Sequence, residues 1–160
     1  MAGKVKAIPE GYARVTPYLV VDGAAAAIDY YTKVFGAKER MRMPAPGNKI
    51  GHAEMKFGNG VIYVGNEWSE TMRSPKSIGA KNTQFLHVHL ESGIDAHCER
   101  ARKAGAVITQ EPTDQFYGDR SYRCLDHEGH LWTFGQTVKT MTFAEMEKAS
   151  GDQFKLREKL

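Results

Sequence analysis

The sequence predicts an α+β fold made of two consecutive βαβββ modules and a C-terminal helix. Strand-like runs and one amphipathic helix follow the same order in each half of the chain. The helix-ending glycines Gly36 and Gly105 are 69 residues apart (105 − 36), and so are the turn glycines Gly60 and Gly129 (129 − 60). A shared offset indicates a structural duplication. Because a four-stranded module is marginally stable alone, we expect the two modules to bury a face or an edge against each other.

The first module is expected to cover residues 12–65. Its helix is predicted from the helix formers Ala24–Ala27 and from apolar residues at helical spacing, including Ile28 and Tyr31. The turn Gly58-Asn59-Gly60 predicts the closing hairpin. The expected elements are strands at 16–22, 37–43, 50–57 and 61–64, and a helix at 23–35.

The second module is expected to cover residues 84–138, after a polar linker at 66–83 that is long enough to be a functional loop or a crossover. Residues 139–160 are expected to form a C-terminal helix and tail, because Thr142 and Glu145 make a capping box. The expected elements of the module are strands at 84–90, 106–110, 122–125 and 131–134, a helix at 94–104 and a loop at 111–119.

Composition excludes several classes of protein. The chain of 160 residues is 41% hydrophobic and 26% charged, as in ordinary soluble domains. A net charge of +3, with Lys and Arg scattered, predicts no nucleic-acid partner. No apolar run reaches the length of a membrane span and no signal peptide is recognisable, so we expect a cytoplasmic protein without a membrane partner. The two cysteines, Cys98 and Cys124, are expected to be buried free thiols.

Several short strings carry a family resemblance over residues 12–138. Together with the tandem modules they resemble the vicinal oxygen chelate superfamily (glyoxalase I, extradiol dioxygenases and bleomycin-resistance proteins), and in particular its PhnB-like branch. The resemblance implies two curled mixed sheets around a cup-shaped cavity, and a homodimer. The strings are Thr16-Pro17-Tyr18-Leu19, Asp22-Gly23-Ala24, Asp29-Tyr30-Tyr31, Val34-Phe35-Gly36-Ala37, Gly51-His52-Ala53-Glu54, Tyr117-Gly118-Asp119-Arg120, and Asp126 through Gly129-His130-Leu131-Trp132.

The resemblance also implies where a metal would bind. Metal-dependent members place four His, Gln or Glu ligands near the start of each module's first strand and on its last strand. The last-strand ligand, typically Glu, falls here on Thr133, and in the first module on Val64 or Tyr63. Near the first strands, at 15–17 and 85–87, only His87 has ligand chemistry. We therefore expect no metal at the usual site and no cofactor; the alternative is a divalent metal at an unconventional site.

Two His-containing pairs are the first candidates for that alternative. His52 and Glu54 are two residues apart on a strand, as are His87 and His89, so the members of each pair share a face. If the pairs faced each other they would form a metal or acid–base site. Alternatively, one or both pairs face solvent or are hydrogen-bonded packing residues.

Four further residues are candidates for binding a ligand. Arg120 is suited to clamp a carboxylate or phosphate and Tyr117 to stack on a flat ligand, or else the loop is braced by an ion pair between Asp119 and Arg120. Tyr63 and Trp132, related by the repeat, line the cavity or belong to the core. The predicted ligand-binding set is therefore His52, Glu54, Tyr63, His87, Tyr117, Arg120 and Trp132.

Four functions remain open. The first is metal-independent binding of a small aromatic or cationic-amphiphilic molecule, as in bleomycin-resistance proteins, and the absent last-strand Glu residues favour it. The second is a metal-dependent lyase, isomerase or dioxygenase that uses His52, Glu54, His87 and His89. The third is a metal-free enzyme with His87 or Glu54 as general base and Arg120 as anion clamp. The fourth is a scaffold without a cavity. No nucleophile motif or nucleotide-binding loop is present.

Overall fold

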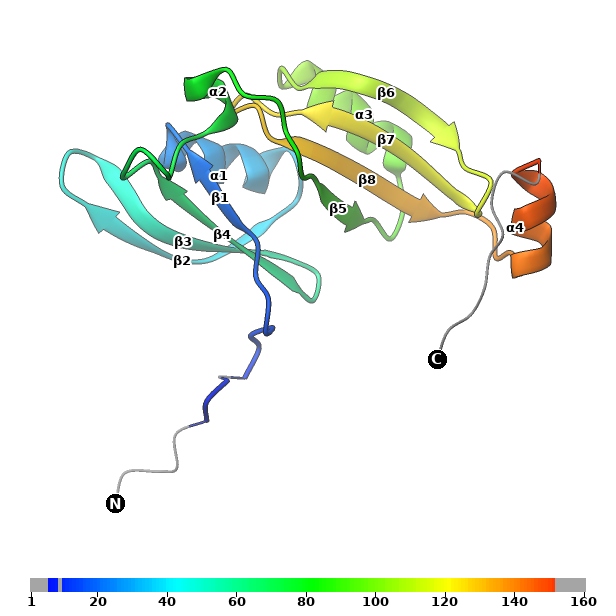
Figure 1. The fold of residues 1–160 in the computed structure, drawn as a ribbon, viewed down its shortest axis with the longest axis horizontal. Coiled ribbons are helices and arrows are strands. Elements are labelled where there is room, and N and C mark those ends of the chain that lie inside the picture. The colour runs from blue at the N-terminus through cyan, green and yellow to red at the C-terminus, as the bar shows by residue number, and fades with distance from the viewer. Residues whose placement is uncertain (1–5, 9, 152–160) are drawn as a thin grey trace. The chain divides into compact units, whose positions relative to one another are not determined.

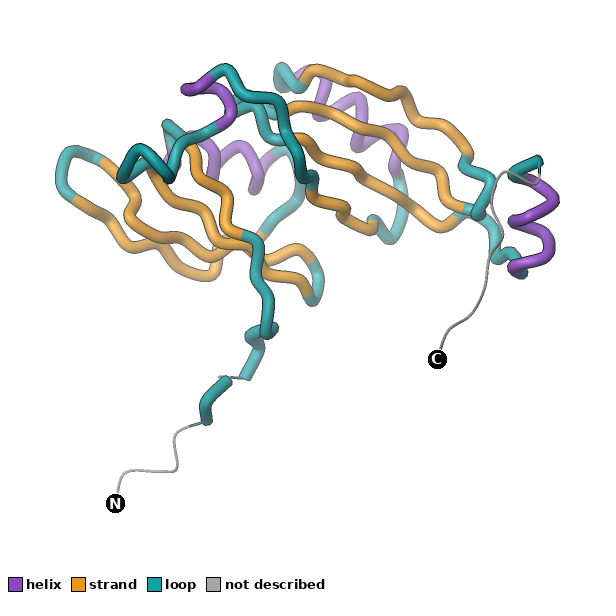
Figure 2. Tube along the Cα trace, viewed as in Figure 1, coloured by secondary structure: helices purple, strands orange, loops and turns teal. Residues whose placement is uncertain are grey.

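The computed structural model describes residues 6–8 and 10–151 (Figure 1, Figure 2). Residues 1–5 and 9, and the part of the expected tail from residue 152 on, lie outside the described residues. The chain divides into two compact units, one within Met1–Lys81 plus Glu128–His130, the other within Asn82–His127 plus Leu131–Leu160. None of the helices in the described part of the chain is long and apolar enough to cross a membrane.

The first unit holds one mixed sheet with the order β1-β4-β3-β2, in which only β1 and β4 are parallel. Helix α1 covers one face and buries Ile28 and Tyr31 there, together with Met55 and Val64 of the sheet. The elements are β1 (Tyr18–Val21), α1 (Ala24–Lys33), β2 (Lys38–Ala45), β3 (Lys49–Phe57), β4 (Gly60–Asn66) and α2 (Pro75–Ile78).

The second unit repeats this topology with the sheet order β5-β8-β7-β6, which confirms the predicted α+β duplication. Helix α3 packs on one face over Tyr122, Trp132 and Phe134. Cys98 and Cys124 are buried and free, as predicted. The elements are β5 (Leu86–His89), α3 (Ile94–Lys103), β6 (Val107–Asp114), β7 (Asp119–Leu125), β8 (Leu131–Thr137) and α4 (Phe143–Ala149).

The C-terminal helix α4 begins at the predicted capping box. The Thr142 Oγ1 accepts a hydrogen bond from the Glu145 amide, and the Glu145 carboxylate accepts one from the Thr142 amide. No residue of this helix is buried. Local capping, rather than burial of an apolar face, therefore defines its start.

Several element boundaries differ from the predictions, and the linker contains a helix that was not predicted. β6 runs on to Asp114 through residues expected to form a loop, and β2 includes Pro44. β2 is an edge strand with a register shift at Met43/Pro44, which is where a sheet tolerates proline. The linker contains the short helix α2, in which Ser74 is the N-cap and Pro75 the first helical residue.

The repeat register also needs correction. Tyr18 lies opposite Tyr63 and His87 lies opposite Thr133, so the offset is 69 on the first strands (87 − 18) but 70 on the last (133 − 63). Five residues, Asp126–His130, connect the pair Leu125 and Leu131, whereas four, Phe57–Gly60, connect the pair Lys56 and Val61. This one extra residue shifts the register of the strand that follows. Tyr63 therefore corresponds to Thr133, and not to Trp132 as predicted.

Candidate functional site

The face of the first sheet that lies opposite α1 carries a polar aromatic cluster. Strand pairing places Tyr18, Tyr63 and Glu54 side by side across β1, β4 and β3. His52 shares the face with Glu54, as the alternation on β3 predicts. We call Tyr12, Tyr18, Arg40, His52, Glu54 and Tyr63 the Glu54 cluster.

Glu54 is the centre of this cluster and is only 6% exposed. The Tyr12 hydroxyl donates to both carboxylate oxygens, at 3.0 and 3.2 Å. The Arg40 guanidinium lies 3.4 Å from Oε2, and the His52 Nε2 lies 3.7 Å from Oε1. Burying a carboxylate is costly unless it is paired, so these contacts offset the loss of hydration.

Aromatic rings surround the carboxylate. His52 stacks edge-on against Tyr63, with ring centroids 4.7 Å apart, and Tyr18 lies 5.8 Å from Tyr63. The hydrogen bond to Glu54, above all, raises the pKa of Tyr12, and burial raises the pKa of Tyr18. Both phenols are therefore neutral hydrogen-bond donors at physiological pH.

A glycine makes room for this arrangement. A Cβ on Gly65 would lie 2.7 Å from the Tyr18 hydroxyl and 3.0 Å from the Gly51 carbonyl oxygen. The Tyr18 side chain therefore lies across the end of β4, where its hydroxyl donates to the Gly51 carbonyl oxygen at 3.2 Å. Only a residue without a side chain permits this close approach.

An open hollow of about 500 Å³ adjoins the cluster. Tyr12 and Tyr63 form part of its wall, so a molecule in the hollow would contact rings that border Glu54. The volume is in the range of small-molecule sites. The other lining residues are Ala7, Ile8, Ala13 and Arg14.

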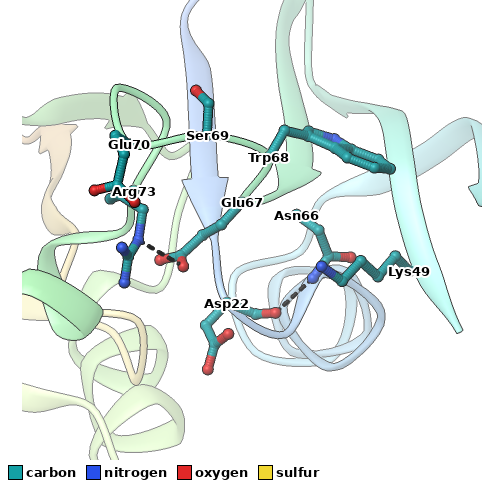
Figure 3. Close-up of a pocket in the computed structure, with 8 residues that line it drawn as sticks. All are labelled: Asp22, Lys49, Asn66, Glu67, Trp68, Ser69, Glu70 and Arg73. Carbon is teal, nitrogen blue, oxygen red and sulfur yellow. Dashed lines mark hydrogen bonds and ion pairs between the residues drawn. The ribbon is translucent and has the colours of Figure 1, made fainter. Parts of the chain in front are cut away.

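A second hollow in the first unit, of about 250 Å³, is more polar (Figure 3). Its Glu67 accepts hydrogen bonds from Arg73 and from the Ser74 amide, at 2.9 and 2.7 Å, and from the Ser77 hydroxyl. Asn66 donates to the Asp22 carbonyl oxygen. These bonds hold the linker around α2, so we assign this hollow a structural role.

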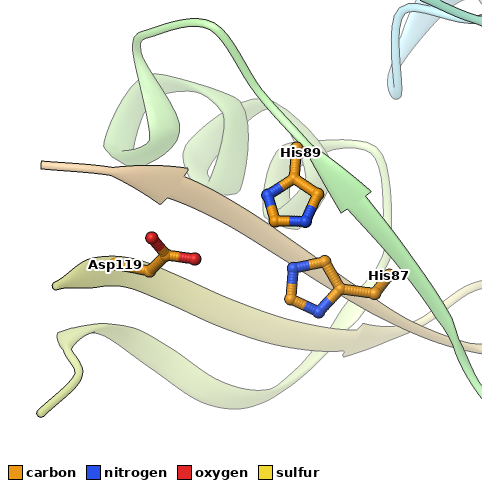
Figure 4. A group of neighbouring side chains, drawn as sticks. All are labelled: His87, His89 and Asp119. Carbon is orange, nitrogen blue, oxygen red and sulfur yellow. The ribbon is translucent and has the colours of Figure 1, made fainter. Parts of the chain in front are cut away.

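In the second unit, the face opposite α3 carries His87, His89 and Asp119 (Figure 4). One ligand atom from each residue lies within 4.8 Å of the others, and the two imidazole centroids are 4.6 Å apart. The sequence placed His87 and His89 on one face but linked Asp119 to Arg120. Because β7 already begins at Asp119, the side chains of Asp119 and Arg120 point to opposite faces of the sheet.

The remaining predicted residues have other surroundings. Arg120 forms ion pairs with Asp95 of α3 at 2.7 Å and Asp114 at 2.9 Å, so it braces α3 and β6 against β7. Trp132 is fully buried and its indole Nε1 donates to the Asp126 carboxylate at 2.9 Å. Tyr117 is half-buried on the β6–β7 turn, with its ring edge-on to Phe116. None of these three enters the sites proposed below.

The metal site implied by the family resemblance does not fit these residues. The sheet register brings Tyr18 opposite Tyr63 and His87 opposite Thr133, on the first and last strands of each module. Of these four residues, only His87 offers a ligand that divalent metals favour. We therefore derive no chemistry from a metal held at those positions.

Comparisons with known proteins agree with this fold. The family model described as "Glyoxalase/Bleomycin resistance protein/Dioxygenase superfamily" matches residues 11–134. An uncharacterized protein of Mycobacterium bovis is 33% identical over 144 residues, which cover 87% of this chain and 93% of that protein. An uncharacterized protein of Mycobacterium tuberculosis is also 33% identical over 144 residues, covering 87% and 83% of the two chains.

Two solved structures extend the comparison. TioX from Micromonospora sp. ML1 is 32% identical, with a TM-score of 0.61 over 81% of this chain and 100% of that one. The fosfomycin resistance protein FosX from Listeria monocytogenes, crystallised with Mn(II) and sulfate, is 14% identical and shares the fold, with a TM-score of 0.60 over 83% and 95% of the two chains. The chain thus belongs to the glyoxalase/bleomycin resistance protein/dioxygenase superfamily.

Proposed function

We propose that this protein binds and sequesters a small organic cation with an aromatic or amphiphilic body, and that the Glu54 cluster is the recognition site. The observation that carries the proposal is the buried Glu54 carboxylate, bordered by the rings of Tyr12, Tyr63 and His52 beside an open hollow. A desolvated carboxylate attracts a cation, and aromatic faces add cation–π attraction. This binding requires no metal.

The protein's own Arg40 indicates which ligand chemistry the cluster accepts. Its guanidinium lies 4.8 Å from the centroid of the Tyr12 ring and 3.4 Å from the Glu54 carboxylate. The Arg40 side chain is 30% exposed, so it lies at the surface of the cluster. A ligand cation would make the same two contacts and would therefore compete with Arg40.

Two variants with opposite expected effects test the proposal. The probe is benzyltrimethylammonium, measured by calorimetry on the full chain against its uncharged tert-butyl counterpart, neopentylbenzene. Glu54→Gln should weaken binding of the cation about 10- to 100-fold, the equivalent of one interaction with a charged group. Arg40→Gln should strengthen it, because the competing guanidinium is removed. Glu91→Gln, an exposed acid of the second unit, is the matched control and should leave binding unchanged.

The reverse pattern would overturn the proposal. If Arg40→Gln abolished binding and Glu54→Gln did not, the site would recognise anions. Equal affinity for the cation and its uncharged counterpart would show that the Glu54 carboxylate does not contribute to recognition of the ligand. Turnover strictly dependent on an added divalent metal would instead favour a lyase, isomerase or dioxygenase.

We extend the proposal in three respects. The strings around Tyr18, His52 and Arg120 favour the PhnB-like branch of the superfamily. We further propose that the protein acts in the cytoplasm as a homodimer. Sedimentation velocity of the purified chain tests the dimer, and a monomer at micromolar concentration would refute it.

A further inference from the structure

We propose that His87, His89 and Asp119 form a binding site for a divalent transition metal of the zinc type, held entirely within the second unit. The three side chains come from β5 and β7 and converge over β8, which lies between those strands (Figure 4). The inference is independent of the proposed cation site, which belongs to the first unit.

The donor set has the chemistry that such a metal prefers. Two imidazole nitrogens and one carboxylate oxygen, all within 4.8 Å of one another, provide three ligands. Three protein ligands leave further coordination positions open to water or a substrate, as in catalytic zinc sites. Imidazole and carboxylate together favour zinc, cobalt or iron over calcium or magnesium.

The sheet is shaped to let these side chains meet. Gly135 of β8 lies opposite His89, and a Cβ there would be 2.9 Å from the His87 Nε2 and 3.7 Å from the Asp119 Oδ2. A Cβ at this position would therefore force the His87 ring to shift. Gly135 therefore keeps the space between the three donors free.

A neighbouring side chain orients one of the three donors. The Thr137 hydroxyl donates to the Asp119 Oδ1 at 2.8 Å and so orients the carboxylate.

A buried hydroxyl supplies an independent observation. Thr133 is 4% exposed, and its Oγ1 has no hydrogen-bond partner among the described residues. The residue lies opposite His87 on the face of the sheet that carries the three donors. A buried polar atom without a partner is costly and needs an explanation, which a ligand bound on this face would provide.

The test is zinc and cobalt binding by the full chain without a histidine tag. We expect one Zn²⁺ per chain in equilibrium dialysis, and visible d–d absorption when Co²⁺ is added. His89→Ala and Asp119→Ala should each lower the affinity at least tenfold, because even the loss of an orienting partner costs 10- to 100-fold. Gly135→Ala should do the same through His87, with an unchanged far-UV circular dichroism spectrum. Thr137→Val should cost about tenfold.

Two histidine variants control for unspecific binding. His127→Ala, in an exposed turn, and His52→Ala, in the first unit, should leave the affinity unchanged. The proposal is wrong if the chain takes up no stoichiometric zinc. It is equally wrong if His52→Ala lowers the affinity as much as His89→Ala, because the ligands would then differ from those proposed.

Discussion

Trp132→Phe should destabilise the second unit and leave ligand recognition intact. The change removes the indole Nε1, which donates to the Asp126 carboxylate at 2.9 Å in a place where both residues are buried. A hydrogen bond to a charged group contributes about 1.5–3 kcal/mol. The smaller phenyl ring also leaves a void beside Phe134, which stacks on the indole with centroids 5.9 Å apart. Together these losses should lower the free energy of unfolding by about 3 kcal/mol.

The two tryptophans make a matched experiment possible, since Trp68 lies in the first unit and Trp132 in the second. Urea unfolding followed by far-UV circular dichroism compares Trp132→Phe with Trp68→Phe. Trp68 is 50% exposed, so its replacement should cost less than about 1 kcal/mol. Benzyltrimethylammonium affinity should stay unchanged in Trp132→Phe. A loss below about 1 kcal/mol, or a weakened affinity for the cation, would refute the assignment of Trp132 to the core.

Two further variants test the first unit. Gly65→Ala places a Cβ 2.7 Å from the Tyr18 hydroxyl and 3.0 Å from the Gly51 carbonyl oxygen. The substitution should lower the free energy of unfolding in urea by about 1–3 kcal/mol and weaken cation binding. Wild-type stability and affinity would contradict the close approach. The hydrogen bond from Ser77, first, and that from the Ser74 amide lower the pKa of Glu67 from 4.5 to about 2. This carboxylate therefore contributes stability above pH 4.5 that is lost as the pH falls toward 2. Glu67→Gln should make acid unfolding curves shallower in that range, and unchanged curves would refute the role of Glu67.

The fold could be predicted from sequence because its signals are local. Gly36 and Gly105 end the helices, and alternation marks the strands, so both the repeat and the α+β class follow from short windows. The register could not be predicted to the residue. One extra residue in the Asp126–His130 turn moves Thr133, rather than Trp132, opposite His87. In a strand, such a shift turns a side chain from one face of the sheet to the other.

The residues of the two sites could be predicted only in part, because alternation along a strand gives only the relative facing of side chains. The alternation of side chains along a strand placed His52 on the same face as Glu54, and His87 on the same face as His89. Alternation does not say which of the two faces a helix covers. Tyr12 reaches Glu54 from a segment without regular structure, and no sequence pattern marks that contact. Gly65 and Gly135 occupy equivalent positions on the last strand of each unit. They are 70 residues apart, so comparing the two halves at an offset of 69 does not pair them.

The equivalence of Gly65 and Gly135 indicates that both copies of the duplicated module kept a glycine at the same position of the last strand. The side chains that surround this glycine differ between the two copies. In each unit a glycine on the last strand makes room for a side chain of the first strand, Tyr18 in one copy and His87 in the other. Each glycine should therefore affect only the ligand of its own unit. Gly65→Ala should weaken benzyltrimethylammonium binding and leave zinc binding unchanged, whereas Gly135→Ala should weaken zinc binding and leave benzyltrimethylammonium binding unchanged. Loss of both affinities in either variant would contradict this division between the two copies.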